Sequence, residues 1–312
     1  RRACIGYTSA FEARATRIFK MARTTSSHVL CVGMGFLDTR LCVERFPPRQ
    51  HRENASKRWD ALGGPASVGA VAVVRLGGTA SFWSRRGDDL AGERVEQLLS
   101  SAGVETSGYR SFPGTTPTCE VFIEPGGERY LFPYLGDGMP GDASWIPEAA
   151  IDRADAALID GRWPEGGMRV AAGARSRGIP CVHDLDQDRA EIWEIAKLST
   201  HVIADEDMAL QCGGVEAVLR RIRSFGAWGA VTLGSRGVAC EGGRVPPFPV
   251  PVQDSTGAGD VFHGAFALAM AQGRDERFAL RFGCAAGALL CKLGEVPHLP
   301  EVEALLSQQP PI

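Results

Sequence analysis

The sequence predicts an α/β domain in which helices cover both faces of a central, mostly parallel sheet. From His28 onwards, short apolar segments rich in β-branched residues alternate with segments of helical spacing. Most of the apolar segments end in a glycine or a polar residue. Because the carboxyl ends of parallel strands meet at one edge of a sheet, this pattern predicts an elongated ligand cleft along that edge.

Composition favours a globular protein with a small-molecule partner. The 312 residues are 44% hydrophobic, and the net charge of −3 is spread along the chain, so nothing favours nucleic acid or a membrane surface as a partner. No stretch reaches the roughly 18 apolar residues of a transmembrane helix. The nine cysteines occur singly and without a C-x-x-C pair, which predicts buried free thiols, no zinc site and a reducing, cytoplasmic location.

Residues 1–27 are expected to be a disordered or artefactual extension, which leaves 28–312 as the folded domain. The first part, 1–20, is basic, contains no methionine and precedes Met21. It fits a transit-like presequence, but we favour a cloning artefact or translated sequence upstream of a start at Met21.

In the first part of the domain, the apolar segment 28–36 is the expected first strand, and Asp38 follows at its carboxyl end. A polar, lid-like segment separates the second strand from a small-residue helix that begins near Pro65. The expected strands are 28–36, 41–46 and 82–84, and the expected helices are 62–78 and 88–102. The last helix has an apolar face of Leu90, Val95, Leu98 and Leu99.

The segment 106–134 changes to extended patterning, with a Pro-Gly-Gly turn at 125–127 between two apolar segments. This predicts a β-hairpin inserted in the α/β chain. We expect a small β lid formed by about 39–60 and 107–135. After it, the α/β alternation resumes, with strands expected at 156–160, 180–183, 201–204 and 230–233 and helices at 167–177, 189–198 and 215–225.

The stretch from Gln253 to Gly273 is the most informative, because an extended segment ends in glycines and continues as a long apolar helix. Gly257, Ala258 and Gly259 allow a sharp turn that presents backbone N–H groups at the positive end of the helix dipole, which is a site for anions. Taken alone, the same residues also fit an ordinary turn, with Asp254, Ser255 or Asp260 as an N-cap.

Two motifs together resemble the paired signatures of the ribokinase-like (PfkB) family of carbohydrate kinases. These are DSTGAGDVFHGAF at 254–266 and LGGPASVGAVAVVRLGG at 62–78. Three further stretches, at 57–59, 159–163 and 279–287, are similar to ketohexokinase and the bacterial sulfofructose kinases. The resemblance implies a three-layer α/β/α fold with a β lid, and transfer of the γ-phosphoryl group of ATP to a sugar hydroxyl.

The resemblance implies a role for each matching position. Asp260 would be the base that accepts the hydroxyl proton, with Gly257, Ala258 and Gly259 as the anion hole. The residues expected to contact the sugar are Asp38, Gly63, Gly64, Arg162 and Arg52. The two arginines are expected to contact an anionic end of the sugar. Residues expected to contact ATP are Thr232, Gly234, Gly237, Thr256 and Gly287.

The chain departs from the family pattern at three places. Pro65 stands where ketohexokinase has Asn, and Pro133 stands where the sulfofructose kinases have Asn. The Asn-x-x-Glu element associated with magnesium is Ala-Asp-Glu-Asp at 204–207. We therefore expect Mg²⁺ to be held through ATP and water, with Asp207 as the candidate protein ligand.

The function predicted is an ATP- and Mg²⁺-dependent kinase of a fructose-like or sulfofructose-like ketose, dimeric through its lid as in relatives. Two alternatives stay open. The acceptor could be a nucleoside, another sugar or a keto acid such as 2-keto-3-deoxygluconate. The chain could also be a catalytically silent relative that senses a sugar or nucleotide.

Overall fold

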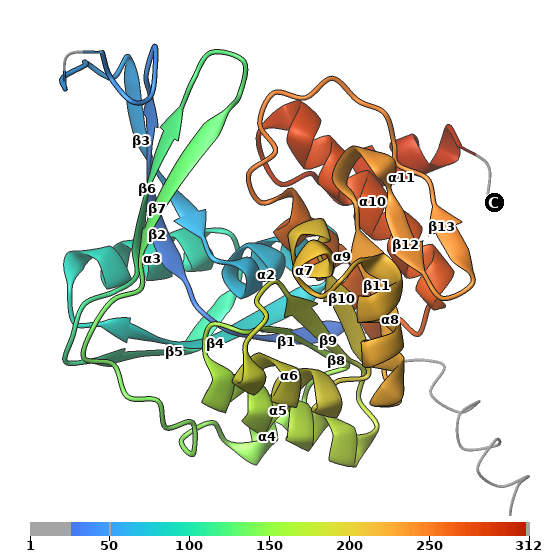
Figure 1. The fold of residues 1–312 in the computed structure, drawn as a ribbon. Helices are drawn as coiled ribbons and strands as arrows, with labels where there is room; N and C mark the ends of the chain where they lie inside the picture. Colours follow the sequence, from blue (N-terminus) through green and yellow to red (C-terminus); the bar gives the residue numbers. More distant parts are fainter. Residues whose placement is uncertain (1–25, 50, 310–312) are drawn as a thin grey trace, which may run out of the picture.

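The computed structural model describes residues 26–49 and 51–309, so most of the expected N-terminal extension lies outside the described residues. Its main sheet has nine strands in the order β13-β12-β11-β10-β9-β8-β1-β4-β5. The seven strands from β11 to β5 are parallel, and β12 and β13 extend the sheet as an antiparallel edge. The predicted α/β fold with a mostly parallel sheet is therefore confirmed (Figure 1).

The strands of the main sheet are β1 (His28–Val32), β4 (Thr79–Gly87), β5 (Glu105–Phe112), β8 (Ala156–Asp160), β9 (Cys181–Leu185), β10 (His201–Ala204), β11 (Trp228–Thr232), β12 (Val238–Cys240) and β13 (Gly243–Val245). The helices are α2 (Pro65–Arg75), α3 (Leu90–Ser101), α4 (Glu148–Asp152), α5 (Pro164–Arg177), α6 (Ala190–Leu198), α7 (Glu206–Gln211), α8 (Val215–Ser224), α9 (Ala258–Ala271), α10 (Glu276–Leu293) and α11 (Leu299–Ser307), with a 3₁₀ turn at Gly234–Arg236.

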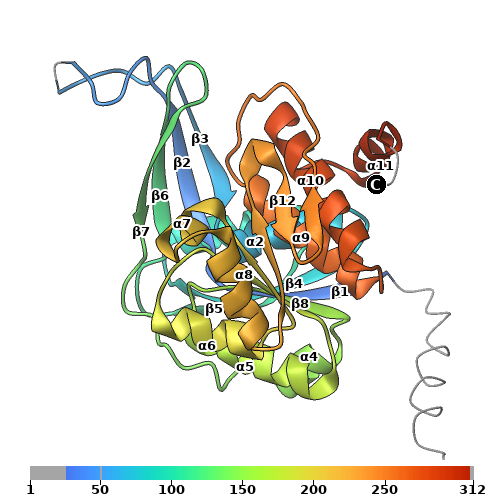
Figure 2. The same cartoon turned by 45° about the vertical axis from the view of Figure 1, so that its right-hand side comes forward.

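Helices form a layer on each face of the main sheet, and each layer encloses one apolar core. One core joins the sheet to α2, α3, α9 and α10, and the other joins it to α4, α5, α6 and α8 (Figures 1 and 2). Successive residues of β1 alternate between them, since Val29 and Cys31 belong to the first core and Leu30 and Val32 to the second. No helix in the described ranges is long and apolar enough to cross a membrane.

A second sheet projects from the body and has the strand order β3-β2-β6-β7. It consists of β2 (Phe36–Cys42), β3 (Lys57–Gly63), β6 (Thr118–Ile123) and β7 (Arg129–Tyr134). We call this four-stranded sheet the lid. In Figure 2 it stands at one side of the body, beside α2.

Several expected boundaries are wrong. The first strand ends at Val32, and Asp38 lies in the lid strand β2, because the chain leaves the main sheet at Gly33. Residues 107–112, expected in the lid, belong to β5, which pairs with β4 in the main sheet. Leu90 is 83% exposed instead of packed, because it is the first residue of α3 after the capping Asp89. The eight described cysteines are free thiols, but only Cys31, Cys119 and Cys181 among them are buried.

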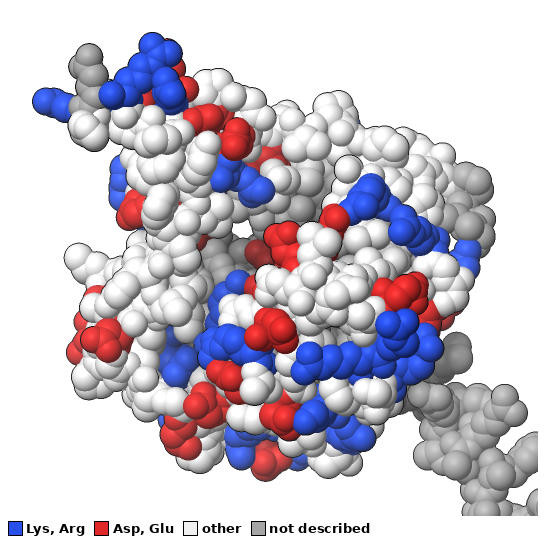
Figure 3. Space-filling model, in the orientation of Figure 1, with Lys and Arg blue, Asp and Glu red and all other residues white. Residues whose placement is uncertain are grey.

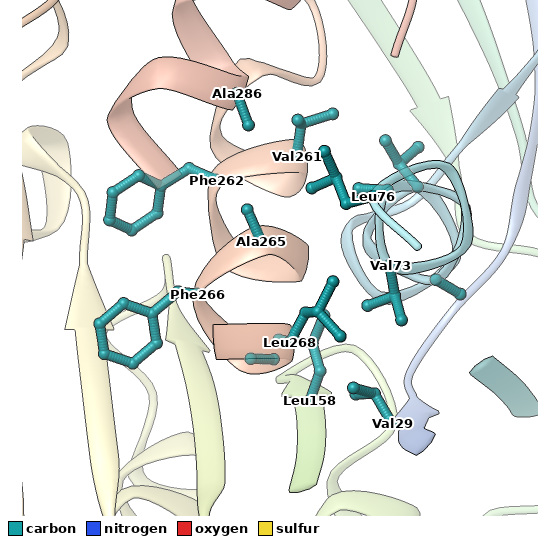
Figure 4. Close-up of a cluster of buried hydrophobic side chains, with 14 of the residues drawn as sticks. Val29, Val73, Leu76, Leu158, Val261, Phe262, Ala265, Phe266, Leu268 and Ala286 are labelled. Atoms are coloured by element: carbon teal, nitrogen blue, oxygen red, sulfur yellow. The ribbon is translucent and has the colours of Figure 1, made fainter. Parts of the chain in front are cut away.

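The position of α9 is fixed by close packing against α2 and α10. Val261, Phe262, Ala265, Phe266 and Leu268 of α9 are buried in the first core, together with Val73 of α2, Leu76 directly after α2 and Ala286 of α10 (Figure 4). A Cβ atom at Gly264 would lie 2.4 Å from the carbonyl oxygen of Gly69, so the backbones of α9 and α2 touch. This packing holds the N-terminus of α9 at the edge of the sheet, facing the lid.

Candidate functional site

The loop before α9 adopts the sharp turn that its glycines predict. Gly257 is the N-cap residue of α9, with φ of 82°, a left-handed conformation that favours glycine. The Asp254 carboxylate accepts hydrogen bonds from the Thr256 N–H at 2.8 Å and the Thr256 hydroxyl at 2.6 Å, which shapes the turn. A Cβ atom at Gly259 would meet no atom within 4 Å, so the first turn of α9 is open to a ligand.

Not all three N–H groups of the predicted anion hole are equally free. The Ala258 N–H donates to the Ser255 carbonyl at 3.2 Å. The Gly259 N–H lies in the first helical turn, where an α-helix supplies no acceptor. A negatively charged ligand would therefore meet Gly259 directly and compete for Ala258.

A cleft of about 760 Å³ lies between the lid, α2 and the start of α9. We call it the acceptor cleft. Figure 3 shows this face of the molecule hollowed between the lid and the body, with acidic and basic side chains at the margin. The cleft brings together residues that are more than 200 positions apart in the sequence. Its lining includes Asp38, Gly63, Gly64, Arg162, Thr256, Gly257, Ala258, Gly259 and Asp260.

Asp38 is held tightly in the acceptor cleft. It is 6% exposed, and a guanidinium nitrogen of Arg40 on the same strand lies 3.7 Å from its carboxylate. A Cβ atom at Gly63 would lie 2.1 Å from an oxygen of Asp38, so glycine is needed there. Gly64, with φ of 96°, begins α2 against the carbonyl of Met34. Burial raises the pKa of Asp38 to about 6, although Arg40 opposes the rise.

Asp260 lies on the floor of the acceptor cleft in the first turn of α9. Its pKa is raised to about 7, chiefly by burial; Arg162 lowers the pKa, and the carboxylates of Asp186, Asp160 and Asp38 add to the rise. A carboxylate with a pKa near neutrality is suited to accept a proton from a hydroxyl group at physiological pH.

Arg162 connects the ends of two sheet strands. Its guanidinium pairs with the Asp186 carboxylate at 2.5 Å, and its backbone N–H donates to Asp160 at 2.9 Å. Asp160 also accepts from the N–H groups of Met34 and Ala66, each at 3.1 Å, and so ties the ends of β1 and β8 to the start of α2. Sequence reasoning assigned no role to Asp160 or Asp186. The available signal was their position, at or just after the end of an apolar strand.

A second cavity of about 670 Å³ lies on the other side of the same loop. We call it the donor pocket. Its walls are largely apolar, with Val238, Phe248, Val250 and Phe262 among them. Four residues assigned to ATP line it, namely Thr232, Gly234, Gly237 and Gly287. Ser255, Ala258 and Gly259 line both cavities, so the loop before α9 is their common wall.

Two glycines of the donor pocket lie close to backbone carbonyl groups. A Cβ atom at Gly287 would lie 2.9 Å from the carbonyl of Ala258, and one at Gly237, with φ of 81°, would lie 2.1 Å from the carbonyl of Val245. A larger residue at Gly287 would therefore press against the first turn of α9, and one at Gly237 would clash with β13. Thr256 differs from expectation, since it lines the acceptor cleft and its hydroxyl bonds to Asp254 there.

Two predicted site residues lie apart from both cavities. Arg52 is exposed in the segment between β2 and β3, and Asp207 is exposed in the first turn of α7. Asp205 caps α7, since its carboxylate accepts from the Met208 N–H at 2.7 Å. Within the described residues, no group of three or more His, Cys, Asp or Glu side chains is arranged to hold a metal ion.

Comparisons with known proteins agree with this geometry. Residues 26–297 match the model of the "pfkB family carbohydrate kinase". The chain is 30% identical to ribokinase of Bacillus subtilis, over 78% of this chain and 87% of that protein. It is 24% identical to mouse ketohexokinase, over 85% and 96%. The crystal structure of a putative ribokinase from Agrobacterium tumefaciens superimposes with a TM-score of 0.86 and 31% identity, over 91% of this chain and 98% of that one.

Proposed function

Because the chain belongs to the pfkB family of carbohydrate kinases, which transfer a phosphoryl group to a sugar hydroxyl, we propose that it uses ATP to phosphorylate a ketose or ketose derivative. One observation carries the proposal. The loop from Ser255 to Gly259 is the shared wall of the acceptor cleft and the donor pocket, and Asp260 stands directly after it on the acceptor side. A phosphoryl group moving between the two cavities would pass this loop.

In this mechanism Asp260 accepts the proton of the attacking hydroxyl group, while the N–H groups at the start of α9 stabilise charge on the phosphoryl oxygens. Phosphoryl transfer needs little covalent participation from the protein, so positioning and electrostatics supply most of the rate. Mg²⁺ would enter with ATP, neutralise phosphate charge and be held through ATP and water, because the predicted ligand Asp207 is exposed and lies apart from both cavities.

Asp38 is the candidate partner of the sugar hydroxyl groups, because its carboxylate faces the acceptor cleft between Gly63 and Arg40. Arg162 lines the cleft beside Asp260 and is the candidate contact for an anionic group of the sugar. Such a group would share the guanidinium with Asp186, which already holds it. Pro65 and Pro133 also line the cleft, so neither offers an amide side chain to the sugar.

Ribose is the second candidate acceptor, favoured by the similarity to ribokinases in sequence and in structure. The test is ADP release measured over a panel of acceptors that contains fructose, sulfofructose, fructose phosphates, ribose, adenosine and 2-keto-3-deoxygluconate. We expect the highest kcat/KM with a ketose. A preference for ribose would select the second candidate, and ATP binding without transfer to any acceptor would identify a silent relative.

We also propose a homodimer formed through the lid, in the cytoplasm. Phe132 and Tyr134 of β7 are 51% and 50% exposed, and they alternate with Leu131 and Pro133, which line the cleft. The exposed aromatic face is thus turned away from the acceptor cleft. Sedimentation analysis should show a dimer that Phe132→Lys converts to a monomer, and a monomeric wild-type protein would contradict the proposal.

A further inference from the structure

Two arginines of the lid reach across the acceptor cleft to the loop before α9. Arg129 of β7 donates to the Thr256 hydroxyl at 2.5 Å and to the Ser255 hydroxyl at 2.9 Å. These serine and threonine side chains directly precede Gly257. The contacts join positions that are more than 120 residues apart, so they depend on where the lid stands relative to the body.

Arg40 of β2 makes the second connection. Its guanidinium donates to the Asp254 carboxylate at 3.2 Å and lies 3.7 Å from the carboxylate of Asp38. Arg40 therefore bridges Asp38, the proposed sugar contact, and Asp254, which directly precedes the loop. Its side chain is 12% exposed, and those of Asp254 and Arg129 are 19% and 24% exposed. At this burial the interactions are screened less than surface ion pairs are.

The opposite side of the loop is tied to the body. The N–H groups of Gln253 and Asp254 both donate to the carbonyl of Cys291 near the end of α10, at 2.7 and 3.3 Å. The lid also approaches the loop through its hairpin turn, since a Cβ atom at Gly127 would lie 3.2 Å from the Gln253 carbonyl. The loop is thus clamped between α10 on one side and the lid on the other.

From these contacts we propose that Arg129 and Arg40 are positioning residues, which couple the position of the lid to the shape of the loop before α9. The reason is that a turn around Gly257 and Gly259 has little conformational preference of its own, so external contacts must hold its N–H groups in place. A lid lifted from the cleft would release Ser255 and Thr256 and loosen the anion hole. The movement of the lid would then set both the geometry of the loop before α9 and the enclosure of the sugar in the acceptor cleft.

The catalytic half of this inference rests on the proposed kinase activity, so the experiment has one measurement that needs no substrate. Hydrogen exchange is measured on the ligand-free protein for peptides that cover 253–260 and 129–134, with β1 as an internal reference. Steady-state kcat and KM are then measured with ATP and the best acceptor. The variants are Arg129→Met, Arg129→Lys and the control Arg58→Met. Arg58 is in the lid strand β3, and its guanidinium pairs 3.2 Å away with Asp60 of the same strand.

Arg129→Met should speed exchange over 253–260 at least severalfold and leave β1 unchanged. It should lower kcat by about 10- to 100-fold, the range expected for charge-assisted hydrogen bonds, while KM for ATP changes little. Arg129→Lys should recover part of kcat, because lysine keeps the positive charge but lacks the guanidinium that donates to two hydroxyl groups at once. Arg58→Met should resemble the wild type.

Unchanged exchange over 253–260 in Arg129→Met would overturn the clamp. Faster exchange with kcat within twofold of the wild type would overturn its coupling to catalysis. If the wild-type protein phosphorylates no acceptor, the proposed function fails, and the exchange measurement still decides whether the lid holds the loop.

Discussion

Replacing Asp260 by Asn tests two effects of this carboxylate, its role in turnover and its effect on the free energy of unfolding. Asn has nearly the same shape but cannot accept the hydroxyl proton. If Asp260 is the base, turnover should fall by on the order of 10²- to 10⁴-fold. ATP binding should persist, because the Asp260 side chain lines the acceptor cleft and not the donor pocket.

The same substitution should stabilise the folded protein at alkaline pH. The pKa of Asp260 is raised from the ordinary 3.8 to about 7, so the folded chain binds this proton more tightly than the unfolded chain does. Below pH 4 the group is protonated in both states and has no effect. As pH rises towards 7 and above, the unfolded chain ionises it freely while the folded chain must bury the charge, so the free energy of unfolding falls.

A pKa raised to about 7 corresponds to at most about 4 kcal/mol. Asp260 is open to the water of the acceptor cleft, which reduces that figure. We therefore expect Asp260→Asn to raise the free energy of unfolding by about 1–3 kcal/mol above pH 8, or roughly 2–8 °C in Tm. The gain should disappear below pH 4.

The assay combines ADP release with thermal unfolding at pH 4 and pH 8.5. Glu303→Gln, in an exposed part of α11, is the matched control for loss of a carboxylate. In the wild type, kcat/KM should rise with pH and level off above about pH 7, as Asp260 loses its proton. Turnover of Asp260→Asn within tenfold of the wild type would refute the assignment of the base, and an unchanged Tm at pH 8.5 would refute the buried-charge argument.

Three further substitutions test other parts of the site. Asp38→Asn should raise KM for the acceptor by about 10- to 100-fold and leave KM for ATP unchanged, as a hydrogen bond to a charged group predicts; equal changes in both would contradict this. Gly287→Val should raise KM for ATP at least tenfold in an ATP titration, because a Cβ atom there lies 2.9 Å from the carbonyl of Ala258. Gly264→Val should lower the free energy of unfolding by about 1–3 kcal/mol in urea, since its Cβ atom would lie 2.4 Å from the carbonyl of Gly69, and full stability would argue against this close packing.

Much of the fold follows from local patterns. Alternation of apolar strands and helices along the chain is enough to predict a parallel sheet with two helical layers, since each element must bury an apolar face. The loop from Gly257 to Asp260 is also recognisable locally, because glycines directly before an apolar helix mark a helix N-terminus that can present N–H groups to an anion. Boundaries near the lid are less predictable, since only three residues separate the end of β1 from the start of β2.

The composition of the acceptor cleft depends on contacts between distant segments. Arg162 was assigned to the sugar from its place after β8, but the structure pairs its guanidinium with Asp186 after β9. The hydrophobic pattern of the sequence does not predict this ion pair, because the pair arises from the order of the strands in the sheet. For Arg52 the sequence predicted a contact that the structure does not show. Its position in the lid sequence suggested a contact with the sugar, but its side chain is exposed and lines neither cavity.

The sequence by itself determined the helix-start loop, its following aspartate and the alternation that builds the sheet, because each depends on residues within one or two turns of chain. Only the tertiary structure decided that Arg40 and Arg129 of the lid reach Asp254, Ser255 and Thr256. Such contacts depend on how the lid stands over the body, which is set by packing summed over the whole molecule. The physical reason is that backbone preferences act locally, whereas a site between two cavities is made where separate elements meet.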